Sequence, residues 1–448
     1  MKKTQHDILL KMVRLVSVVF MTGLFGLGWY LHYTKNLSPY YAKENYLIIA
    51  LFLILFITFG KVYDAFEISI NRISEMAYSQ SLAVLAADGV IFIVTWLLMK
   101  DFPKIIPMLI VFASQCVAAI VWAYFANRWY FRTFDPKKTA IIYDKRVGMK
   151  KLINEYGLNK KYNVQQKMQV ADCLNHLSCL DGLDTVFISG VHSHERNIIL
   201  KYCIAHNIEV LVIPRVGDVI MSSARPMHMF HLPMLRLRRY NTSPEYLFVK
   251  RLIDIVVSAN AIILLSPIML IVAIAIKVYD GGPVIYSQVR LTKDAKLFNI
   301  YKFRSMRTDA EKDGVARLST GDNDNRITPI GRIIRKCRLD ELPQLFNILV
   351  GDISLVGPRP ERPEIAAQYC EEMPEFALRL QAKAGLTGYA QIYGQYNTAP
   401  CDKLQMDLMY IAHPSIIEDL KIILGTVKIL FMPESTEGIE EGKTTAAK

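Results

Sequence analysis

The stretch RKCRLDELPQLFNILVGDISLVGPRPE, residues 335–361, decides how the rest of the chain is interpreted. It places two adjacent carboxylates, Asp340 and Glu341, between three cations on one side and Arg359 on the other. Proline is tolerated in the first turn of a helix, so Pro343 predicts a helix that starts near Asp340. Backbone N–H groups at that start would favour a phosphate group. On spacing alone, the alternative that these acids only cap the helix stays open.

Composition limits the classes of protein that the chain can belong to. Its 448 residues have room for two or three domains, and 52% hydrophobic residues is high for a soluble protein. The formal charge of +12 fits a membrane surface or a phosphorylated substrate. Nucleic acid is not an expected partner, because no arginine-rich arm or aromatic-basic motif is present. The seven cysteines lack metal-ligand spacing and indicate reduced thiols in a cytoplasm. No cleavable signal peptide is expected.

Four apolar segments open the chain, each near the length needed to cross a bilayer. Basic residues cluster before the first and after the fourth, so the positive-inside rule predicts both ends of this bundle in the cytoplasm. Polar residues inside the segments are sparse, which disfavours a transporter. The segments are Leu15–Leu31, Tyr46–Phe59, Ala83–Met99 and Ile105–Ala126.

Residues 137–215 alternate between strand-like and helical patterns. That order predicts a small parallel α/β unit of Rossmann type. Only one glycine follows the first strand, so a structural or interaction domain is favoured over a nucleotide-binding one. The strand-like runs are 139–143, 184–189 and 209–214, and the helical runs are 148–157 and 195–207.

Residues 250–280 are apolar enough to span a bilayer, but both ends carry charge. Ser266 and Pro267 lie near the midpoint, where proline removes a backbone hydrogen bond and serine can bond the carbonyl that is left without a donor. We interpret this segment as a re-entrant helical hairpin that enters one leaflet, turns at Pro267 and returns. A straight fifth span is the alternative.

Beyond residue 247 a series of ordered motifs resembles the bacterial sugar transferases, which are monotopic phosphoglycosyl transferases. Together the motifs are specific, although each alone is weak. With its N-terminal bundle and α/β unit, the chain is similar to the larger branch, which includes undecaprenyl-phosphate glucose and galactose phosphotransferases. The motifs are KRLID at 250–254, the Ser266–Pro267 break, GGPVIYSQVR at 281–290, YKFRSM at 301–306, LDELPQ at 339–344, GDISLVGPRPE at 351–361 and GLTGYAQ at 385–391.

The resemblance implies that an aspartate attacks the sugar-side phosphorus of a UDP-sugar, releases UMP and passes the sugar phosphate to undecaprenyl phosphate. Asp340 matches this nucleophile and is the expected protein ligand of Mg²⁺, and Glu341 matches its partner. Because a carboxylate and a diphosphate repel each other, the site needs cations. Surface ion pairs are the alternative role for those cations. The expected substrate-binding residues are Lys302, Arg304, Arg335, Arg359 and Glu361.

Two positions depart from the family pattern. Ala384 stands where the family often has a proline, and Gln395 stands where an arginine often follows the GLTGYAQ motif. The second change puts the sugar in doubt, although UDP-glucose or UDP-galactose is the expected donor. The lipid bilayer is a further expected partner, and a homo-oligomer stays open.

The predicted architecture combines a membrane helical bundle, a Rossmann-like α/β domain and an α-rich phosphoglycosyl transferase domain. The transferase domain would face the cytoplasm at a bacterial inner membrane and initiate capsule, exopolysaccharide or O-antigen assembly. A membrane scaffold or ligand sensor is the competing interpretation. The predicted boundaries are 1–132 for the bundle, 133–220 for the α/β domain, 221–246 for a basic, irregular linker, 247–432 for the transferase domain with its re-entrant helix at 251–277, and 433–448 for a disordered tail.

Overall fold

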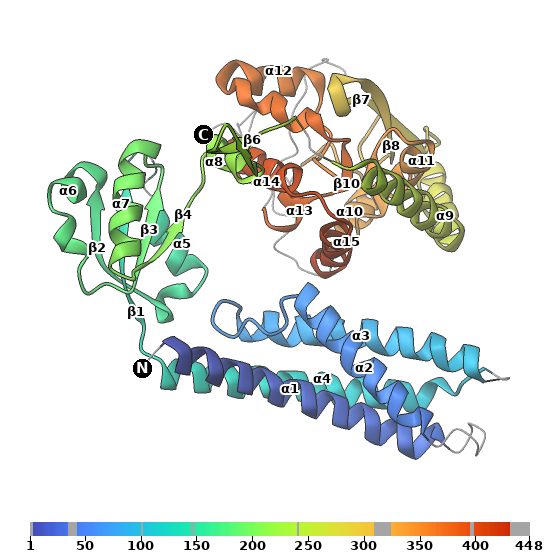
Figure 1. The fold of residues 1–448 in the computed structure, drawn as a ribbon. Helices are drawn as coiled ribbons and strands as arrows, with labels where there is room; N and C mark the ends of the chain where they lie inside the picture. Colours follow the sequence, from blue (N-terminus) through green and yellow to red (C-terminus); the bar gives the residue numbers. More distant parts are fainter. Residues whose placement is uncertain are drawn as a thin grey trace. The chain divides into compact units, whose positions relative to one another are not determined.

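The computed structural model describes two compact units, Met1–Ile213 and Pro214–Lys448, shown as a ribbon in Figure 1. Gln395 and the predicted tail at 433–448 lie outside the described residues. Those residues are 3–34, 43–99, 102–144, 146, 148–239, 242–308, 324–394 and 398–430.

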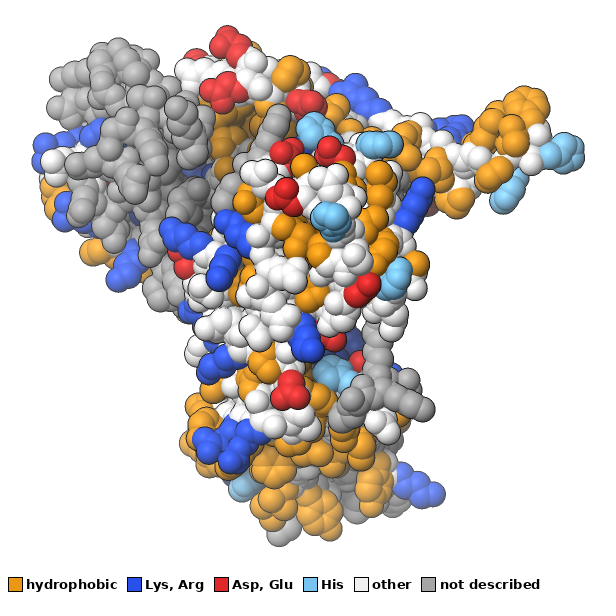
Figure 2. Space-filling view, turned by 90° about the vertical axis from the view of Figure 1, so that its left-hand side faces the viewer, with side chains coloured by type: hydrophobic (Ala, Val, Ile, Leu, Met, Phe, Trp, Pro, Cys, Tyr) orange, Lys and Arg blue, Asp and Glu red, His pale blue; other side chains and the backbone are white. Residues whose placement is uncertain are grey.

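The first unit opens with four apolar helices, as the sequence predicts. Aromatic rings pack between them, and Phe25 stacks on Phe52 with ring centroids 4.2 Å apart. Many large apolar side chains are nevertheless exposed, and Figure 2 shows them gathered over this bundle at the lower end of the view. Such a surface suits lipid better than water. The helices are α1 (Lys3–His32), α2 (Glu44–Val62), α3 (Ile73–Leu98) and α4 (Ile105–Thr133).

A four-stranded parallel sheet completes the first unit, with strand order β2-β1-β3-β4. Strands β1, β3 and β4 form where the sequence predicts them. Strand β2 was missed because its residues, YNVQQKMQ, are mostly polar and lie at an exposed edge. The relation to Rossmann-type domains stays a prediction. The elements are β1 (Lys137–Tyr143), α5 (Met149–Glu155), β2 (Tyr162–Gln169), α6 (Val170–Asn175), β3 (Thr185–Ser189), α7 (Ser193–Ala205) and β4 (Glu209–Val212).

The second unit begins with helix α8 (Val216–Ser222) and an antiparallel hairpin, β5 (Arg225–Met229) and β6 (Leu232–Arg236). The prediction of an irregular linker over 221–246 is therefore wrong for these residues. Phe230 and His231 form the turn with φ angles of 55° and 63°. Two-residue hairpin turns need positive φ, usually supplied by Asn-Gly or Gly, so this turn lacked its usual sequence signal.

Helix α9 (Pro244–Asp280) follows, starting at the N-cap Ser243 and ending at Gly281 with φ 68°. It is the fifth helix in the described residues that is long and apolar enough to cross a membrane. The backbone stays helical through Pro267, so the predicted hairpin turn at this position is wrong. The Ser266 hydroxyl donates to the carbonyl of Ile263 at 2.8 Å, which replaces the hydrogen bond that Pro267 cannot make.

The rest of the second unit surrounds one apolar core that includes Ile348, Leu404 and Ile422. Most of its helices are short, and two small sheets connect them. The elements are β7 (Ile285–Leu291) paired with β8 (Leu297–Phe303), α10 (Pro329–Lys336), α11 (Gln344–Val350), β9 (Ser354–Val356) paired with β10 (Gly385–Thr387), α12 (Pro363–Glu372), α13 (Tyr389–Ile392), α14 (Pro400–Ala412) and α15 (Ile416–Leu430).

Candidate functional site

Asp340 and Glu341 lie in a single 3₁₀ turn, Leu339–Glu341, between α10 and α11. Arg338, with φ 52°, reverses the chain just before this turn. Helix α11 itself starts at Gln344, so the predicted helix start near Asp340 is four residues too early. The helix is also only seven residues long. The dipole of α11 therefore does not place a phosphate at the acid pair.

Two side chains, one half-buried and one fully buried, fix the position of this turn. Leu339 packs against the cluster that contains Ile276 of α9 and Phe303 of β8. Asn347 of α11 is fully buried; its side-chain oxygen accepts from the Tyr301 backbone N–H at 3.0 Å and its amide donates to the Asn299 carbonyl at 2.8 Å. These bonds tie α11 to β8, which carries Lys302. Sequence reasoning missed Asn347, because nothing in the sequence distinguishes it from an ordinary helix residue.

Glu341 is held by two cations that are distant in the sequence. The Lys302 ammonium donates to its Oε1 at 2.8 Å, and the Arg359 guanidinium donates to the same oxygen at 3.0 Å. Burial alone would raise the pKa of Glu341, but Lys302 and Arg359 outweigh burial and hold it well below its usual range. Glu341 is therefore a fixed carboxylate rather than a proton carrier.

Asp340 lies in a different environment, although it is adjacent. Its side chain is buried, and within the described residues no hydrogen bond or ion pair engages its carboxylate. Burial raises the pKa of Asp340, and the charge of Lys302 opposes the effect. Arg335, in the last turn of α10, adds a weaker positive field. Adjacent acids in unequal environments are typical of sites where the two have different roles.

Arg304 does not join the acid pair. Its buried guanidinium forms a two-pronged ion pair with Asp280 at the C-terminal end of α9. A Cβ added to Gly282 would approach this guanidinium to 2.7 Å, so the GG step leaves room for it. Arg304 thus anchors α9, and sequence reasoning missed its partner Asp280.

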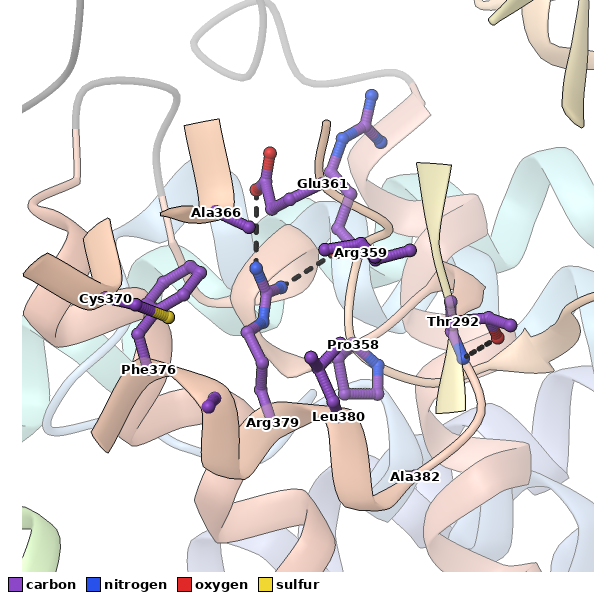
Figure 3. Close-up of a pocket in the computed structure, with 13 residues that line it drawn as sticks. Thr292, Pro358, Arg359, Glu361, Ala366, Cys370, Phe376, Arg379, Leu380 and Ala382 are labelled. Carbon is purple, nitrogen blue, oxygen red and sulfur yellow. Dashed lines mark hydrogen bonds and ion pairs between the residues drawn. The ribbon is translucent and has the colours of Figure 1, made fainter. Parts of the chain in front are cut away.

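Glu361 lies behind Arg359, beside a small cavity shown in Figure 3. Arg379 reaches Glu361 from the 3₁₀ helix Pro374–Gln381, with 3.4 Å between its Nη1 and the Glu361 Oε1. Arg290 of β7 lies 3.9 Å from the other carboxylate oxygen. Sequence reasoning missed Arg379, which stands alone in an apolar stretch.

The site offers few side chains that could bind a metal ion. This suits Mg²⁺, which can take most of its ligands from the substrate and water, but not a metal that is held by protein side chains alone. Within the described residues, no group of three or more His, Cys, Asp or Glu side chains is arranged to hold a metal ion. Mg²⁺ prefers oxygen ligands and often takes only one or two carboxylates when phosphates complete its shell. The Asp340 carboxylate, with no protein partner among the described residues, fits that limited role.

Apolar helices together with an acid pair held among cations define a membrane-associated protein with a site suited to an anionic group. The model of the bacterial sugar transferase family matches residues 245–433. An exopolysaccharide production protein of Rhizobium leguminosarum bv. phaseoli is 43% identical over 192 residues, which are 40% of this chain and 94% of that protein. The chain therefore belongs to the bacterial sugar transferase family.

Two longer relatives carry more specific names. An N-acetylgalactosaminephosphotransferase of Aeromonas hydrophila, acting from UDP-N-acetylgalactosamine to undecaprenyl phosphate, is 37% identical over 52% of this chain and 54% of its own length. A UDP-glucose:undecaprenyl-phosphate glucose-1-phosphate transferase of Klebsiella pneumoniae is 40% identical over 49% of this chain and 48% of its own length. The chain thus matches about half the length of these relatives, and their sugars differ.

Proposed function

We propose that this protein transfers a sugar 1-phosphate from a UDP-sugar to undecaprenyl phosphate and releases UMP. The observation that carries the proposal is the unequal acid pair: Glu341 is neutralised by Lys302 and Arg359, whereas Asp340 is unpaired within the described residues. The names of the A. hydrophila and K. pneumoniae relatives support the acceptor. The lipid-linked product would initiate a capsule, exopolysaccharide or O-antigen repeat unit.

In the first step, an Asp340 oxygen attacks the phosphorus that bears the sugar. The bond from this phosphorus to the bridging oxygen breaks, and UMP leaves with that oxygen. In the second step, a phosphate oxygen of undecaprenyl phosphate attacks the same phosphorus and releases the Asp340 carboxylate. Covalent catalysis of this kind divides one difficult displacement into two. Glu341 keeps Lys302 and Arg359 beside the reacting phosphate.

The positive groups have separate tasks in this mechanism. Lys302 and Arg359 stabilise the charge that builds on the phosphoryl oxygens, and Arg335 adds to the field from α10. Glu361 is proposed to orient the substrate from behind Arg359. Mg²⁺, when bound by Asp340 and the diphosphate, would supply further neutralisation of phosphate charge.

Contacts of α9 support a re-entrant path through the membrane. Near its start, Lys250 forms an ion pair with Asp419 of the second unit at 2.9 Å. At its end, Asp280 pairs with Arg304 of the same unit. In the middle, one side of the helix is exposed, with Leu264 at 75%, whereas Ile262 and Leu265 pack against the core of the unit. A helix whose two ends bind one globular unit returns to the side it came from, so we infer that α9 bends at Pro267 within one leaflet.

With this path, we propose that the catalytic unit lies on the cytoplasmic side of a bacterial inner membrane, where nucleotide sugars are made. The helices α1–α4 would anchor it there. We further propose that the parallel sheet of the first unit is a Rossmann-like structural or interaction domain.

A panel of UDP-sugars with undecaprenyl phosphate, read as UMP release, tests the proposed function. UDP-glucose and UDP-galactose are the expected donors, and UDP-N-acetylgalactosamine belongs in the panel because of the A. hydrophila relative. Release that depends on both a UDP-sugar and undecaprenyl phosphate supports the proposal. A folded, membrane-inserted protein that releases no UMP with any donor would contradict it and favour a scaffold or sensor.

A further inference from the structure

A buried ion pair lies behind the proposed active site and has no assigned role. Arg379 is 5% exposed and Asp407, on α14, is 1% exposed. The Arg379 Nη2 and the Asp407 Oδ2 are 2.7 Å apart. Burying two charges removes both from water, and well-packed apolar residues often stabilise a fold equally well. A pair this deeply buried therefore calls for an explanation other than stability.

Arg379 contacts the segment that carries Arg359. Its Nη2 donates to the Arg359 carbonyl oxygen at 2.8 Å, and its Nη1 donates to Glu361 at 3.4 Å. Figure 3 shows the guanidinium directed at both residues. The ring of Phe376 lies 4.9 Å beneath it. The rigid guanidinium thus fixes the backbone of Arg359 and the side chain of Glu361 together.

The same Arg359 reaches the acid pair with its side chain. Its guanidinium donates to Glu341 at 3.0 Å, while its own carbonyl is held by Arg379. One residue therefore links the buried ion pair to the site of chemistry. A small displacement of the Arg359 backbone would move the guanidinium away from Glu341 and from the reacting phosphate.

Asp407 depends on Arg379 for compensation of its charge. Three charged groups face it: Arg379 from the 3₁₀ helix, Glu361 from the loop, and Lys403 one turn earlier on α14. Within the described residues, neither oxygen of Asp407 accepts a well-aligned hydrogen bond. Burial raises the pKa of Asp407 to about 6, although Arg379 opposes the rise. Its charge therefore changes at a pH close to neutrality.

We propose that Arg379 and Asp407 form a positioning pair that holds Arg359 against Glu341, and that the charge on Asp407 is needed for this. The inference rests on the proposed transferase function, since Arg359 is placed there as a phosphate contact. Neither residue of the pair is proposed to touch substrate. Above pH 6 the ionised Asp407 holds Arg379 in place, and below it the protonated acid holds Arg379 less firmly.

The test compares full-length wild type with Asp407→Asn, which keeps the shape but removes the charge. At pH 8 we expect kcat for UMP release to fall about tenfold while KM for the UDP-sugar changes much less, because misplacement of a catalytic group weakens the transition state. The ratio of wild-type to variant kcat should approach one as the pH falls through about 6. Because wild type and variant share all other titrating groups, the ratio of their kcat values removes the contribution of those groups to the pH dependence.

Two further variants separate positioning from stability. Arg379→Lys keeps a cation beside Asp407 but loses the planar guanidinium with its two donor groups. We therefore expect kcat to fall, while kcat of this variant should still change as the pH passes through about 6. Asp419→Asn breaks a different buried ion pair of this unit, with Lys250, and should lower the melting temperature without moving the pH profile. If Asp407→Asn fails to fold, Arg379→Lys and its profile decide the question.

The outcomes distinguish the two levels of the proposal. Wild type that releases no UMP contradicts the proposed function itself. Active wild type, with folded Asp407→Asn or Arg379→Lys variants that keep wild-type kcat, overturns the positioning pair alone. An equal loss of kcat at every pH in Asp407→Asn would also overturn it, because a purely structural defect has that signature.

Discussion

Glu341 accepts hydrogen bonds from Lys302 and Arg359, whereas Asp340 accepts none within the described residues. At the scale of single residues, this asymmetry assigns the proposed roles. An amide at position 341 would keep the size of the side chain but remove the charge that holds both cations. The cations would then lose their fixed position beside the reacting phosphate.

Glu341→Gln should therefore lower kcat for UMP release on the order of a hundredfold, within the range for loss of a preorganised electrostatic contact. The covalent sugar phosphate on Asp340 should still form, only more slowly. Stopped reactions followed by mass spectrometry measure both. Glu364→Gln, an acid-to-amide change at an exposed position on α12, is the matched control and should keep wild-type rates. A Glu341→Gln enzyme with wild-type kcat would remove Glu341 from the site.

The residue types of the site were largely predictable, but their partners were not. The acid pair and the cations Lys302 and Arg359 stand in motifs, and the structure brings these four together. Arg304 looked equivalent in sequence, yet it pairs with Asp280, because partners distant in the sequence depend on how α9 packs. Arg379 gave no signal at all, since a lone arginine in an apolar stretch is usually exposed.

At the scale of elements, the proposed path of α9 depends on a local irregularity in the helix. Pro267 removes one helical hydrogen bond, and Ser266 compensates for it with its hydroxyl. Proline in a helix interior costs about 3 kcal/mol, so restoring a regular sequence should favour a straight helix.

Replacing both Ser266 and Pro267 by leucine should move some molecules toward a spanning form and lower UMP release in proportion. Accessibility of a single cysteine after α9 reports the fraction that spans, and activity is measured on the same preparation. Val256→Leu, at an exposed position in the same helix, adds apolar bulk away from Ser266 and Pro267 and is the control. Unchanged topology together with unchanged activity in the double variant would show that the bend has no part in placing α9.

Helices and strands with a strong sequence pattern were predicted correctly, and those with a weak pattern were missed. Long apolar helices and buried strands were predicted, because hydropathy and period are strong over such lengths. The edge strand β2 and the β5–β6 hairpin were missed, because polar edge residues and a Phe-His turn lack the usual signals. Around Asp340, the left-handed Arg338 and Pro343 gave a 3₁₀ turn instead of the predicted helix.

At the scale of the whole molecule, both ends of α9 bind the second unit, and the proposed site lies in that unit. The proposed function requires this unit to lie on the side of the membrane that holds UDP-sugars. Glu245, at the start of α9, and Ser287, on β7 beyond its end, are exposed and suit cysteine probes. A re-entrant helix places both on the same side, and a straight span separates them.

With the native cysteines replaced, Glu245→Cys and Ser287→Cys should both resist an impermeant thiol reagent in intact cells and react after lysis. A cysteine introduced in a segment exposed outside the cell confirms that the reagent works. Labelling of Ser287→Cys in intact cells would establish a straight span and put the site on the wrong side of the membrane for its donor.

The covalent intermediate on Asp340 is the central claim, and intact-protein mass spectrometry tests it most directly. Purified protein is mixed with Mg²⁺ and the UDP-sugar that supports turnover, without undecaprenyl phosphate. The account predicts a mass increase of one sugar phosphate, its loss when undecaprenyl phosphate is added, and no increase in folded Asp340→Asn. An adduct that persists in Asp340→Asn, or UMP release by wild type with no adduct under conditions that trap acyl phosphates, would contradict it.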